Sequence, residues 1–230
     1  MLEGAGLVKT FHGGDGTPVH VLDGVSLRVA RGEIVAVVGA SGAGKSTLLH
    51  VLGALDAPTG GTVTIDGRPL AGLDDAAMAA LRNRSVGFVF QFHHLLREFS
   101  ALENVMMPLR IAGRAEGEAR RRAEELLERV GLGARAHHRP AALSGGEQQR
   151  TAVARALAAD PAVFLADEPS GNLDHGNAER LHALLSELAR DLETAMVVVT
   201  HNRSLAARAD RVLLLEDGRL TDVPERSVAG

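Results

Sequence analysis

Residues 39–46 read Gly-Ala-Ser-Gly-Ala-Gly-Lys-Ser, which fits the pattern G-x-x-x-x-G-K-[ST]. The continuous apolar run Ile34–Val38 comes directly before this loop and predicts a strand that is buried on both faces. Residues 46–55 follow the loop and predict a helix. Glycines let such a loop wrap around a phosphate with its N–H groups pointing inward, and the helix adds its positive N-terminal end. The sequence therefore predicts a phosphate-binding turn between a buried strand and a helix.

This phosphate loop supplies most of the candidate nucleotide-binding residues. We expect the Lys45 ammonium to reach the β- and γ-phosphates, Ser46 to place its hydroxyl on Mg²⁺, and Thr47 to support the same phosphates. The candidate set comprises Gly39, Ala40, Ser41, Gly42, Ala43, Gly44, Lys45, Ser46 and Thr47. The loop by itself leaves a kinase, a GTPase and an ATPase open.

Lysine is almost absent from the chain. The 25 basic residues include lysine only at Lys9 and Lys45, and arginine occupies every other basic position. A compact ammonium on a flexible stem suits a place between two phosphates better than a planar guanidinium does. Position 45 therefore has the residue type that phosphate binding requires.

The composition excludes several other classes of protein. The net charge of −4 disfavours a protein that coats nucleic acid, so we expect no nucleic-acid partner. The absence of cysteine excludes a disulfide framework and cysteine-based metal or nucleophile chemistry. Apolar stretches such as Ala195–Val199 are far shorter than the roughly 18 residues that cross a bilayer. With no signal segment at its start, the chain is expected to stay in the cytoplasm and to need a membrane-spanning partner for any membrane role.

Strand and helix signals alternate along most of the chain. Residues 5–36 carry strand patterns, strands and helices alternate after residue 160, and residues 93–160 are dominated by helical patterns. In the latter, apolar residues from Ala119 to Val130 follow one helical face, and the charged run between them is expected to be solvated. The other expected elements are strands at 62–65, 86–90, 163–166, 196–199 and 211–216 and a helix at 178–192. This order predicts an α/β fold with a mainly parallel sheet, interrupted by a helical insertion.

Two acids end the apolar run at 163–166. In phosphate-loop enzymes an aspartate at such a strand end holds Mg²⁺, which assigns the metal to Asp167. Because successive side chains on a strand point in opposite directions, Glu168 is then free to orient and deprotonate an attacking water. The second acid favours hydrolysis over transfer to a small acceptor.

A second anion-binding turn is expected at 143–150, which reads Leu-Ser-Gly-Gly-Glu-Gln-Gln-Arg before a helix at 151–159. Ser144, Gly145 and Gly146 would form its helix start. This segment resembles the signature motif of ABC-type ATPases, whose other motifs occur in order between about residues 3 and 220. Gln91 resembles the Q-loop glutamine, 170–174 the D-loop, and His201 the H-loop histidine. Phe11 is placed like the aromatic residue that stacks on adenine, although a core position is its alternative.

The resemblance implies a P-loop NTPase (ABC ATPase) core with a mixed, mainly parallel sheet, an N-terminal antiparallel β subdomain and an inserted α-helical subdomain. One domain would occupy 1–230, with its nucleotide-binding core at 1–91 and 160–230 and the helical subdomain at 92–159. The implied ligands are ATP and Mg²⁺, with Ser46, Gln91 and Asp167 at the metal. The implied catalytic residues are Glu168, His201 and Gln91. ATP would lie between two copies in a head-to-tail homodimer, where Ser144, Gly145, Gly146 and Asp174 also approach the nucleotide.

A narrower resemblance is carried by Gln-Phe-His-His-Leu-Leu at 91–96, together with segments 101–105, 137–140 and 171–174. These residues are similar to the LolD/MacB/FtsE-type group, and most of all to its lipoprotein-releasing ATPases. The resemblance implies ATP-driven release of lipoproteins through LolC/LolE-like integral membrane subunits, with this chain peripheral at the cytoplasmic face of the inner membrane. MacB-type export and FtsE-type cell division remain alternatives. Arg97, Glu98, Gln148 and Asn202 depart from the usual pattern, but none is a phosphate-contacting position.

Segment 92–110 is expected to contact the membrane partner. Its apolar residues Phe92, Leu95, Leu96, Phe99 and Leu102 would form the contact surface. Internal packing of the same residues is the alternative. Outside transport, the classes that remain are an ABC ATPase acting on DNA or ribosomes, a small-molecule kinase, and a regulatory subunit without turnover.

Overall fold

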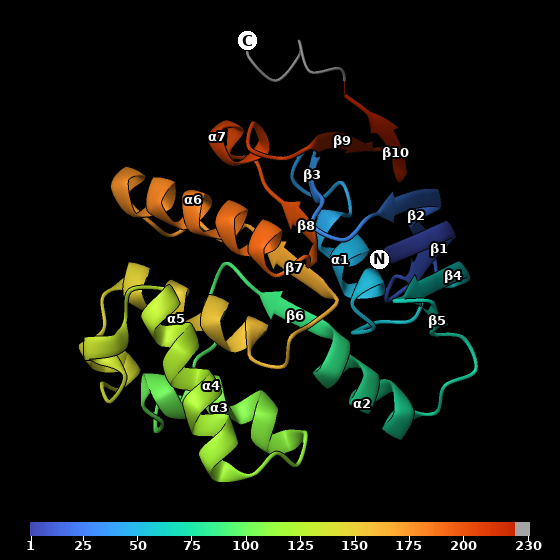
Figure 1. Ribbon diagram of the computed structural model, residues 1–230. Helices are drawn as coiled ribbons and strands as arrows, with labels where there is room; N and C mark the ends of the chain where they lie inside the picture. The colour runs from blue at the N-terminus through green and yellow to red at the C-terminus, as the bar shows by residue number, and fades with distance from the viewer. Residues whose placement is uncertain (224–230) are drawn as a thin grey trace.

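Two sheets organise the protein in the computed structural model, which describes residues 1–223 (Figure 1). The end of the expected domain, 224–230, lies outside the described residues. The larger sheet has the strand order β10-β9-β3-β8-β7-β6, in which only β10 runs antiparallel to its neighbour. Its strands are β3 (Ile34–Val38), β6 (Val86–Val89), β7 (Val163–Asp167), β8 (Ala195–Val199), β9 (Arg211–Glu216) and β10 (Arg219–Asp222).

The centre of this sheet is apolar because helices cover both of its faces. All five residues of β8 are buried, and so are the first four of β3 and of β7. The continuous apolar runs predicted these strands because a strand without a solvent face shows no polar alternation. The predicted mixed, mainly parallel sheet is therefore observed.

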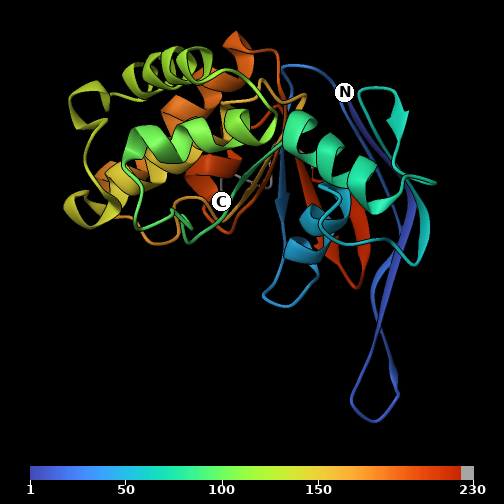
Figure 2. The same cartoon turned by 90° about the horizontal axis from the view of Figure 1, so that it is seen from below.

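The smaller sheet is antiparallel and has the order β2-β1-β4-β5. Its strands are β1 (Leu2–His12), β2 (Pro18–Val29), β4 (Gly60–Ile65) and β5 (Arg68–Pro69). The ends of β1 and β2 continue beyond the sheet as a two-stranded arm (Figure 2). Residues 11–20 are exposed along this arm because no third strand or helix covers it.

The helices fall into two groups. One lies with the sheets and consists of α1 (Lys45–Leu52), α2 (Asp75–Ser85), α6 (His175–Asp191) and the short α7 (Arg203–Ala206). The other forms a helical half, which consists of α3 (Ala101–Ile111), α4 (Glu116–Arg129) and α5 (Gly145–Leu157) (Figures 1 and 2). Helix α5 also packs against β6 and α6, so this half shares an apolar core with the sheet. Helix α4 buries Ala119, Ala123, Leu126 and Leu127 on one face, as the helical spacing predicted. The helical insertion into the α/β core is thus also observed.

Helix boundaries differ from the sequence-based expectations at three places. Helix α1 ends at Leu52 rather than 55, because Gly53 caps it and Ala54 adopts a left-handed φ of 58°. Helix α5 begins at Gly145 rather than 151, because Ser144 and Glu147 form a reciprocal capping box. Helix α6 begins at His175 rather than 178, because the Asp174 side chain accepts a hydrogen bond from the Asn177 N–H.

One edge of the large sheet gathers the carboxyl ends of four neighbouring parallel strands. In the order β3-β8-β7-β6, these ends lead into the phosphate loop, Thr200 and His201, Glu168, and Gln91. Open α/β sheets bind ligands outside the carboxyl ends of their strands. The strand order therefore brings residues from four distant parts of the chain to one edge.

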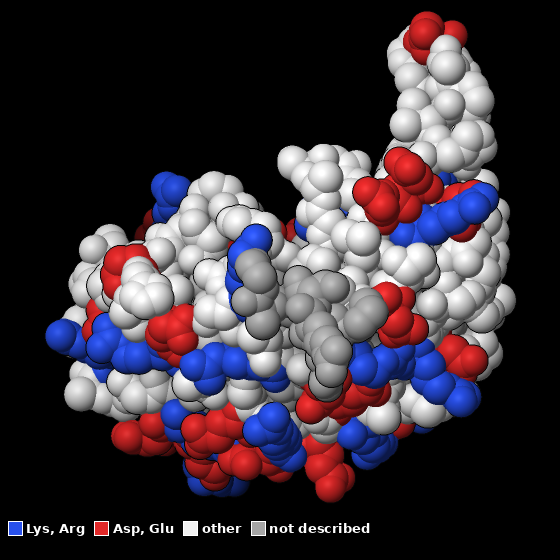
Figure 3. Space-filling view, turned by 90° about the horizontal axis from the view of Figure 1, so that it is seen from above, with Lys and Arg blue, Asp and Glu red and all other residues white. Residues whose placement is uncertain are grey.

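The surface seen from above carries acidic and basic side chains in close alternation, whereas the flanks of the projecting arm carry almost none (Figure 3). Within residues 1–223, no helix has both the length and the apolar character needed to cross a membrane.

Candidate active site

The phosphate loop lies between β3 and α1, where the sequence placed it. Gly39 has a φ of 155° and lies against the carbonyl oxygen of Leu215, so a side chain at 39 would collide with the backbone of β9. Gly44 has a φ of 95° and caps α1 in the left-handed region. These two glycines let the loop turn back over the N-terminus of α1, where N–H groups without helical partners are available to an anion.

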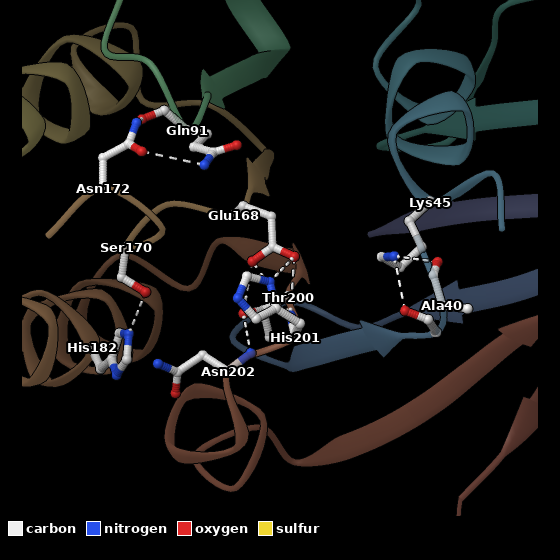
Figure 4. A network of polar contacts seen from close by, with 11 residues as sticks. Ala40, Lys45, Gln91, Glu168, Ser170, Asn172, His182, Thr200, His201 and Asn202 are labelled. Carbon is white, nitrogen blue, oxygen red and sulfur yellow. Dashed lines mark hydrogen bonds and ion pairs between the residues drawn. The ribbon is translucent and has the colours of Figure 1, made fainter. Parts of the chain in front are cut away.

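Lys45 folds back over this loop. Its Nζ donates hydrogen bonds to the carbonyl oxygens of Gly39 and Ala40, at 2.9 and 2.8 Å (Figure 4). These contacts hold the ammonium above the loop, where it can exchange a carbonyl for a phosphate oxygen. Ser46 is exposed in the first turn of α1, and Thr47 is half-buried beside it.

Phe11 lies on the projecting arm and is 42% exposed, so it is not a core residue. The Nζ of Lys9 lies 4.9 Å from the centre of its ring. The same ammonium donates to the Asp56 carboxylate and to the Ala57 carbonyl oxygen, both at 2.7 Å. Lys9 thus occupies one face of the ring in a cation–π contact. A planar ligand would stack on the other face.

Asp167 is the last residue of β7, and Glu168 leaves the strand with a left-handed φ of 46°. The expectation that strand alternation separates the two acids was wrong, because Glu168 no longer belongs to the strand. This backbone conformation costs a non-glycine residue about 1–2 kcal/mol. It is supported by a hydrogen bond of 2.9 Å from the Glu168 N–H to the Val199 carbonyl oxygen. A turn, rather than the pleat, therefore sets the direction of Glu168.

Glu168 and His201 are bound to each other (Figure 4). The Nδ1 of His201 lies 2.8 Å from Oε1 of Glu168, and the His201 backbone N–H donates to the same oxygen at 3.0 Å. Thr200 donates its hydroxyl to Oε2 at 3.2 Å. Because an ionised carboxylate can only accept, Nδ1 carries the proton and Nε2 remains for a further contact. The imidazole is 75% exposed, so that nitrogen faces an open space.

Gln91 and Asn172 are joined across the site. The Nε2 of Gln91 donates to Oδ1 of Asn172 at 3.3 Å, and Nδ2 of Asn172 donates to the Gln91 carbonyl oxygen at 3.1 Å (Figure 4). Gly171 allows this approach, since a Cβ there would lie 2.9 Å from Nε2 of Gln91. The segment after β6 is thereby fastened to the segment after β7.

The second anion turn begins α5. Ser144 and Gly145 are exposed, whereas Gly146 is buried against Asn177 of α6. The hydroxyl of Ser144 already accepts the N–H of Glu147 at 3.3 Å. Asp174 likewise caps α6, and its hydrogen bonds from Asn177 hold the pKa of its carboxyl below the usual range. Within one chain, the side chains of Ser144 and Asp174 are thus already engaged as helix caps.

The expected apolar surface at 92–110 is only partly exposed. Phe92, Leu96 and Phe99 are 62%, 43% and 37% exposed, whereas Leu95 and Leu102 are 8% and 2% exposed. The expectation that Leu95 and Leu102 are exposed was wrong, because Leu102 packs in the helical core and Leu95 is largely buried in the wall of a groove. A groove of about 610 Å³ lies beside Phe92, between residues 92–97 and the segment that leads into α5.

Sequence reasoning assigned no role to several groups of the site. Thr200 directly precedes His201, and Asn172 belongs to the D-loop, so a motif-based search could have included both. In the sequence, Lys9 stands out only because lysine is rare in this chain. No sequence signal points to its contacts with Phe11 and Asp56, since they depend on the antiparallel sheet.

Residues 22–171 match the ABC transporter family. The chain is 60% identical over 202 residues to the lipoprotein-releasing system ATP-binding protein LolD of Bordetella pertussis, covering 88% of this chain and 87% of that protein. It is 53% identical over 222 residues to LolD of Shewanella frigidimarina, covering 96% and 92%.

A solved structure extends the likeness to the whole fold. The ATP-binding cassette MJ0796, a dimer in a post-hydrolysis state bound to ADP and Pi, superposes with a TM-score of 0.89 at 38% identity. The superposition covers 98% of this chain and 99% of that one. The predicted ATPase fold, the use of ATP and its hydrolysis are thereby confirmed. This chain belongs to the ABC transporter family and, within it, to the LolD type of ATP-binding protein.

Proposed function

We propose that this chain is the ATP-hydrolysing subunit of a complex that releases lipoproteins from the inner membrane through LolC/LolE-like membrane subunits. The observation that carries the proposal is the 60% identity to a lipoprotein-releasing ATP-binding protein over 88% of the chain. The MacB-type and FtsE-type alternatives have no comparable observation in their favour. The chain would act at the cytoplasmic face of the inner membrane, as a single domain with a core at 1–91 and 160–230 and a helical subdomain at 92–159.

The decisive experiment reconstitutes the complex. The tagged chain, purified from membranes, should bring integral membrane subunits with it. In proteoliposomes that contain this complex and a lipoprotein, ATP should release the lipoprotein to a soluble acceptor. A complex that hydrolyses ATP at the same rate with and without lipoprotein, and releases none, would contradict the proposed cargo while leaving the ATPase assignment intact.

The phosphate loop would hold the triphosphate. Its N–H groups and the N-terminus of α1 would bind the β-phosphate, Lys45 would bridge the β- and γ-phosphates, and Thr47 would support them. The loop comprises Gly39, Ala40, Ser41, Gly42, Ala43, Gly44, Lys45, Ser46 and Thr47. The support for this arrangement is the exposed position of Ser46 and the contacts of Lys45, which extends over the loop rather than into solvent.

The residues present fit Mg²⁺. Ser46 offers a hydroxyl, Gln91 offers an amide oxygen, and Asp167 offers a carboxylate. No other residue of 1–223 donates a hydrogen bond to the Asp167 carboxylate, so its oxygens are available to the ion. Within the described chain, no cluster of three or more His or acidic side chains could hold the ion alone. This agrees with the preference of Mg²⁺ for few protein ligands, with phosphate and water oxygens completing the shell. The ion would neutralise charge on the phosphates.

Glu168 would act as the general base that orients and deprotonates the attacking water. The His201 imidazole would turn its free Nε2 toward the γ-phosphate while Nδ1–H stays with Glu168. Gln91 would complete the site at the end of β6 and relay its state to the helical half. The contact between Glu168 and His201 supports a shared role, because each holds the other in a defined orientation.

Phe11 would stack on the adenine. Phe11→Ala is expected to raise KM for ATP roughly fivefold, because a stacked aromatic contact contributes about 1 kcal/mol. Phe11→Tyr should stay within twofold of the parent, since stacking requires only a ring face. Val19→Ala, which alters the exposed cross-strand partner of Phe11, is the matched control. Steady-state ATPase kinetics measure the effect, and an unchanged KM in Phe11→Ala would contradict the stacking role.

Two chains would close around ATP head to tail. Within one chain, α1 lies with the sheets and α5 lies in the helical half (Figures 1 and 2), so the phosphate loop and the signature turn belong to different halves. Ser144, Gly145, Gly146 and Asp174 would therefore approach the nucleotide of the partner chain. The dimeric state of the related cassette MJ0796 supports this arrangement.

The groove beside segment 92–97 would receive the membrane subunit. It is lined by Phe92, His93, His94, Leu95 and Arg97 on one side and by Pro140, Ala141 and Gln148 on the other. The exposure of Phe92 and Leu96 supports this assignment, because exposed large apolar residues beside a groove are typical of interfaces.

Phe92→Asp or Leu96→Asp should weaken binding to the membrane subunits roughly 30-fold, since loss of one apolar anchor costs about 2 kcal/mol. The ATPase activity of the isolated chain should be unchanged. Ile111→Asp is the matched control, because Ile111 is 67% exposed and lies outside the groove. Leu95→Asp is unsuitable, since it buries a charge. Co-purification is the measurement, and full retention of the membrane subunits by both variants would contradict the assignment.

A further inference from the structure

A buried histidine lies behind the candidate active site. His182 is on α6, is fully buried, and has polar partners on both ring nitrogens. Its Nε2 lies 2.8 Å from the hydroxyl of Ser170, which is also buried (Figure 4). Its Nδ1 lies 3.4 Å from the hydroxyl of Ser204 on α7 and 3.5 Å from the Glu179 carboxylate. A buried imidazole with partners on both sides links three separate segments.

The chemistry of these partners assigns the protons. Glu179 accepts hydrogen bonds from Ser204 and from Arg208, which together lower the pKa of its carboxyl. Burial lowers the pKa of His182, so its ring is neutral and has one donor and one acceptor. Because the Ser204 hydroxyl donates its proton to Glu179, its oxygen can only accept from His182, and Nδ1 therefore carries the proton. Nε2 is then the acceptor for the hydroxyl of Ser170.

These contacts and the Glu168–His201 pair together form a closed cycle of linked residues. Ser170 follows Glu168 by two residues, and Ser204 follows His201 by three. On the side of the candidate active site, Glu168 and His201 are bound to each other. On the buried side, His182 contacts the hydroxyls of Ser170 and Ser204. We propose that His182 is a positioning residue that sets the geometry of the Glu168–His201 pair by holding both segments from behind.

Two features make this more than core packing. Glu168 has a left-handed backbone that its surroundings must maintain, and the hydroxyl of Ser170 is the nearest side-chain anchor after it. The other anchor of the same segment, Asn172, is attached to Gln91 and not to α6. The carboxylate of Glu179, the imidazole of His182 and the hydroxyl of Ser170 also follow one another as in a catalytic triad, in which the serine is the nucleophile. The burial of Ser170 excludes that role, because no substrate can reach its hydroxyl.

This inference rests on the proposed roles of Glu168 and His201, and its test compares turnover with stability. His182→Phe keeps a ring of similar size but has no hydrogen-bonding atoms. We expect kcat for ATP hydrolysis to fall about tenfold with KM within twofold, because a small misplacement of a catalytic pair lowers turnover more than binding. Ser170→Ala should give the same fall, and the double variant should be no worse, since both remove one hydrogen bond. His182→Gln, whose amide can accept from Ser170, should recover part of kcat.

Leu181→Val is the matched control, because it reduces the buried core of the same helix without touching Ser170. It should lower Tm and leave kcat unchanged. Three results would each overturn the inference. The first is a near-parental kcat in His182→Phe and Ser170→Ala, the second is additive losses in the double variant, and the third is an equal loss of kcat in Leu181→Val. Glu168→Gln and His201→Ala are measured in parallel. If those two variants turn over normally, the proposed site fails; if they do not and the His182 series is normal, only this inference fails.

Discussion

Glu168→Gln is expected to lower ATP hydrolysis by about 10³-fold, while ATP still binds. The substitution keeps the shape of the side chain but removes the group that accepts a proton from water, and general-base catalysis contributes roughly 10²–10⁴-fold. It also replaces a carboxylate that accepts hydrogen bonds from the His201 N–H, the His201 ring and the Thr200 hydroxyl. Because the triphosphate is not cleaved, the variant should accumulate as an ATP-bound dimer.

Single-turnover hydrolysis and size-exclusion chromatography with ATP measure these two effects. Glu187→Gln is the matched control, since it removes the same charge from an exposed position on α6. Its turnover and oligomeric state should equal those of the parent. If Glu168→Gln hydrolyses ATP at the parental rate, Glu168 is not the general base. If it is inactive but does not dimerise with ATP, the base assignment holds and the head-to-tail arrangement does not.

Lys45→Ala is expected to weaken ATP binding roughly 100-fold, because a charge-assisted contact with phosphates contributes about 1.5–3 kcal/mol. Lys45 also donates hydrogen bonds to two carbonyl oxygens of its own loop. The loss therefore also loosens the loop that receives the phosphates. Isothermal titration with a non-hydrolysable ATP analogue measures the affinity.

Lys45→Arg separates the charge of this residue from its shape. It keeps the positive charge, but a planar fork fits poorly in a place made for a compact ammonium, so binding should remain at least about tenfold weaker. Thermal unfolding without nucleotide should be similar for the parent and both variants. An unchanged affinity in Lys45→Ala would contradict the phosphate-loop assignment, whereas parental affinity in Lys45→Arg alone would show that only charge matters.

Local patterns predicted much of the fold. The strand Ile34–Val38 is observed with its predicted ends, because an apolar run bounded by polar residues and a glycine-rich turn leaves little choice. The phosphate loop was predictable for the same reason, since its glycines and Lys45 act over a few consecutive residues. Helix ends were less accurate where a cap decided them. Ala54 and Ser144 show that a single left-handed residue or a capping box moves a boundary by several positions.

Side-chain orientation was the other source of error. Leu95 and Leu96 are adjacent leucines in an irregular segment, and the sequence there does not distinguish the buried one from the exposed one. Leu102 lies on the buried face of α3. Glu168 was assigned its direction from the pleat of a strand, yet the strand ends one residue earlier. In both cases the deciding contacts come from elements that lie elsewhere in the chain.

The sequence by itself determined the α/β class, the phosphate loop and the order of the motifs, because each depends on residues that are near neighbours. Only the tertiary structure decided how those motifs meet. Glu168 contacts His201 across 33 positions and Gln91 contacts Asn172 across 81, because β6, β7 and β8 are adjacent in the sheet. The bond between Ser170 and His182 likewise requires α6 to lie against the turn after β7. Strand order and helix packing minimise the free energy of the whole chain, so no local pattern specifies which distant side chains meet.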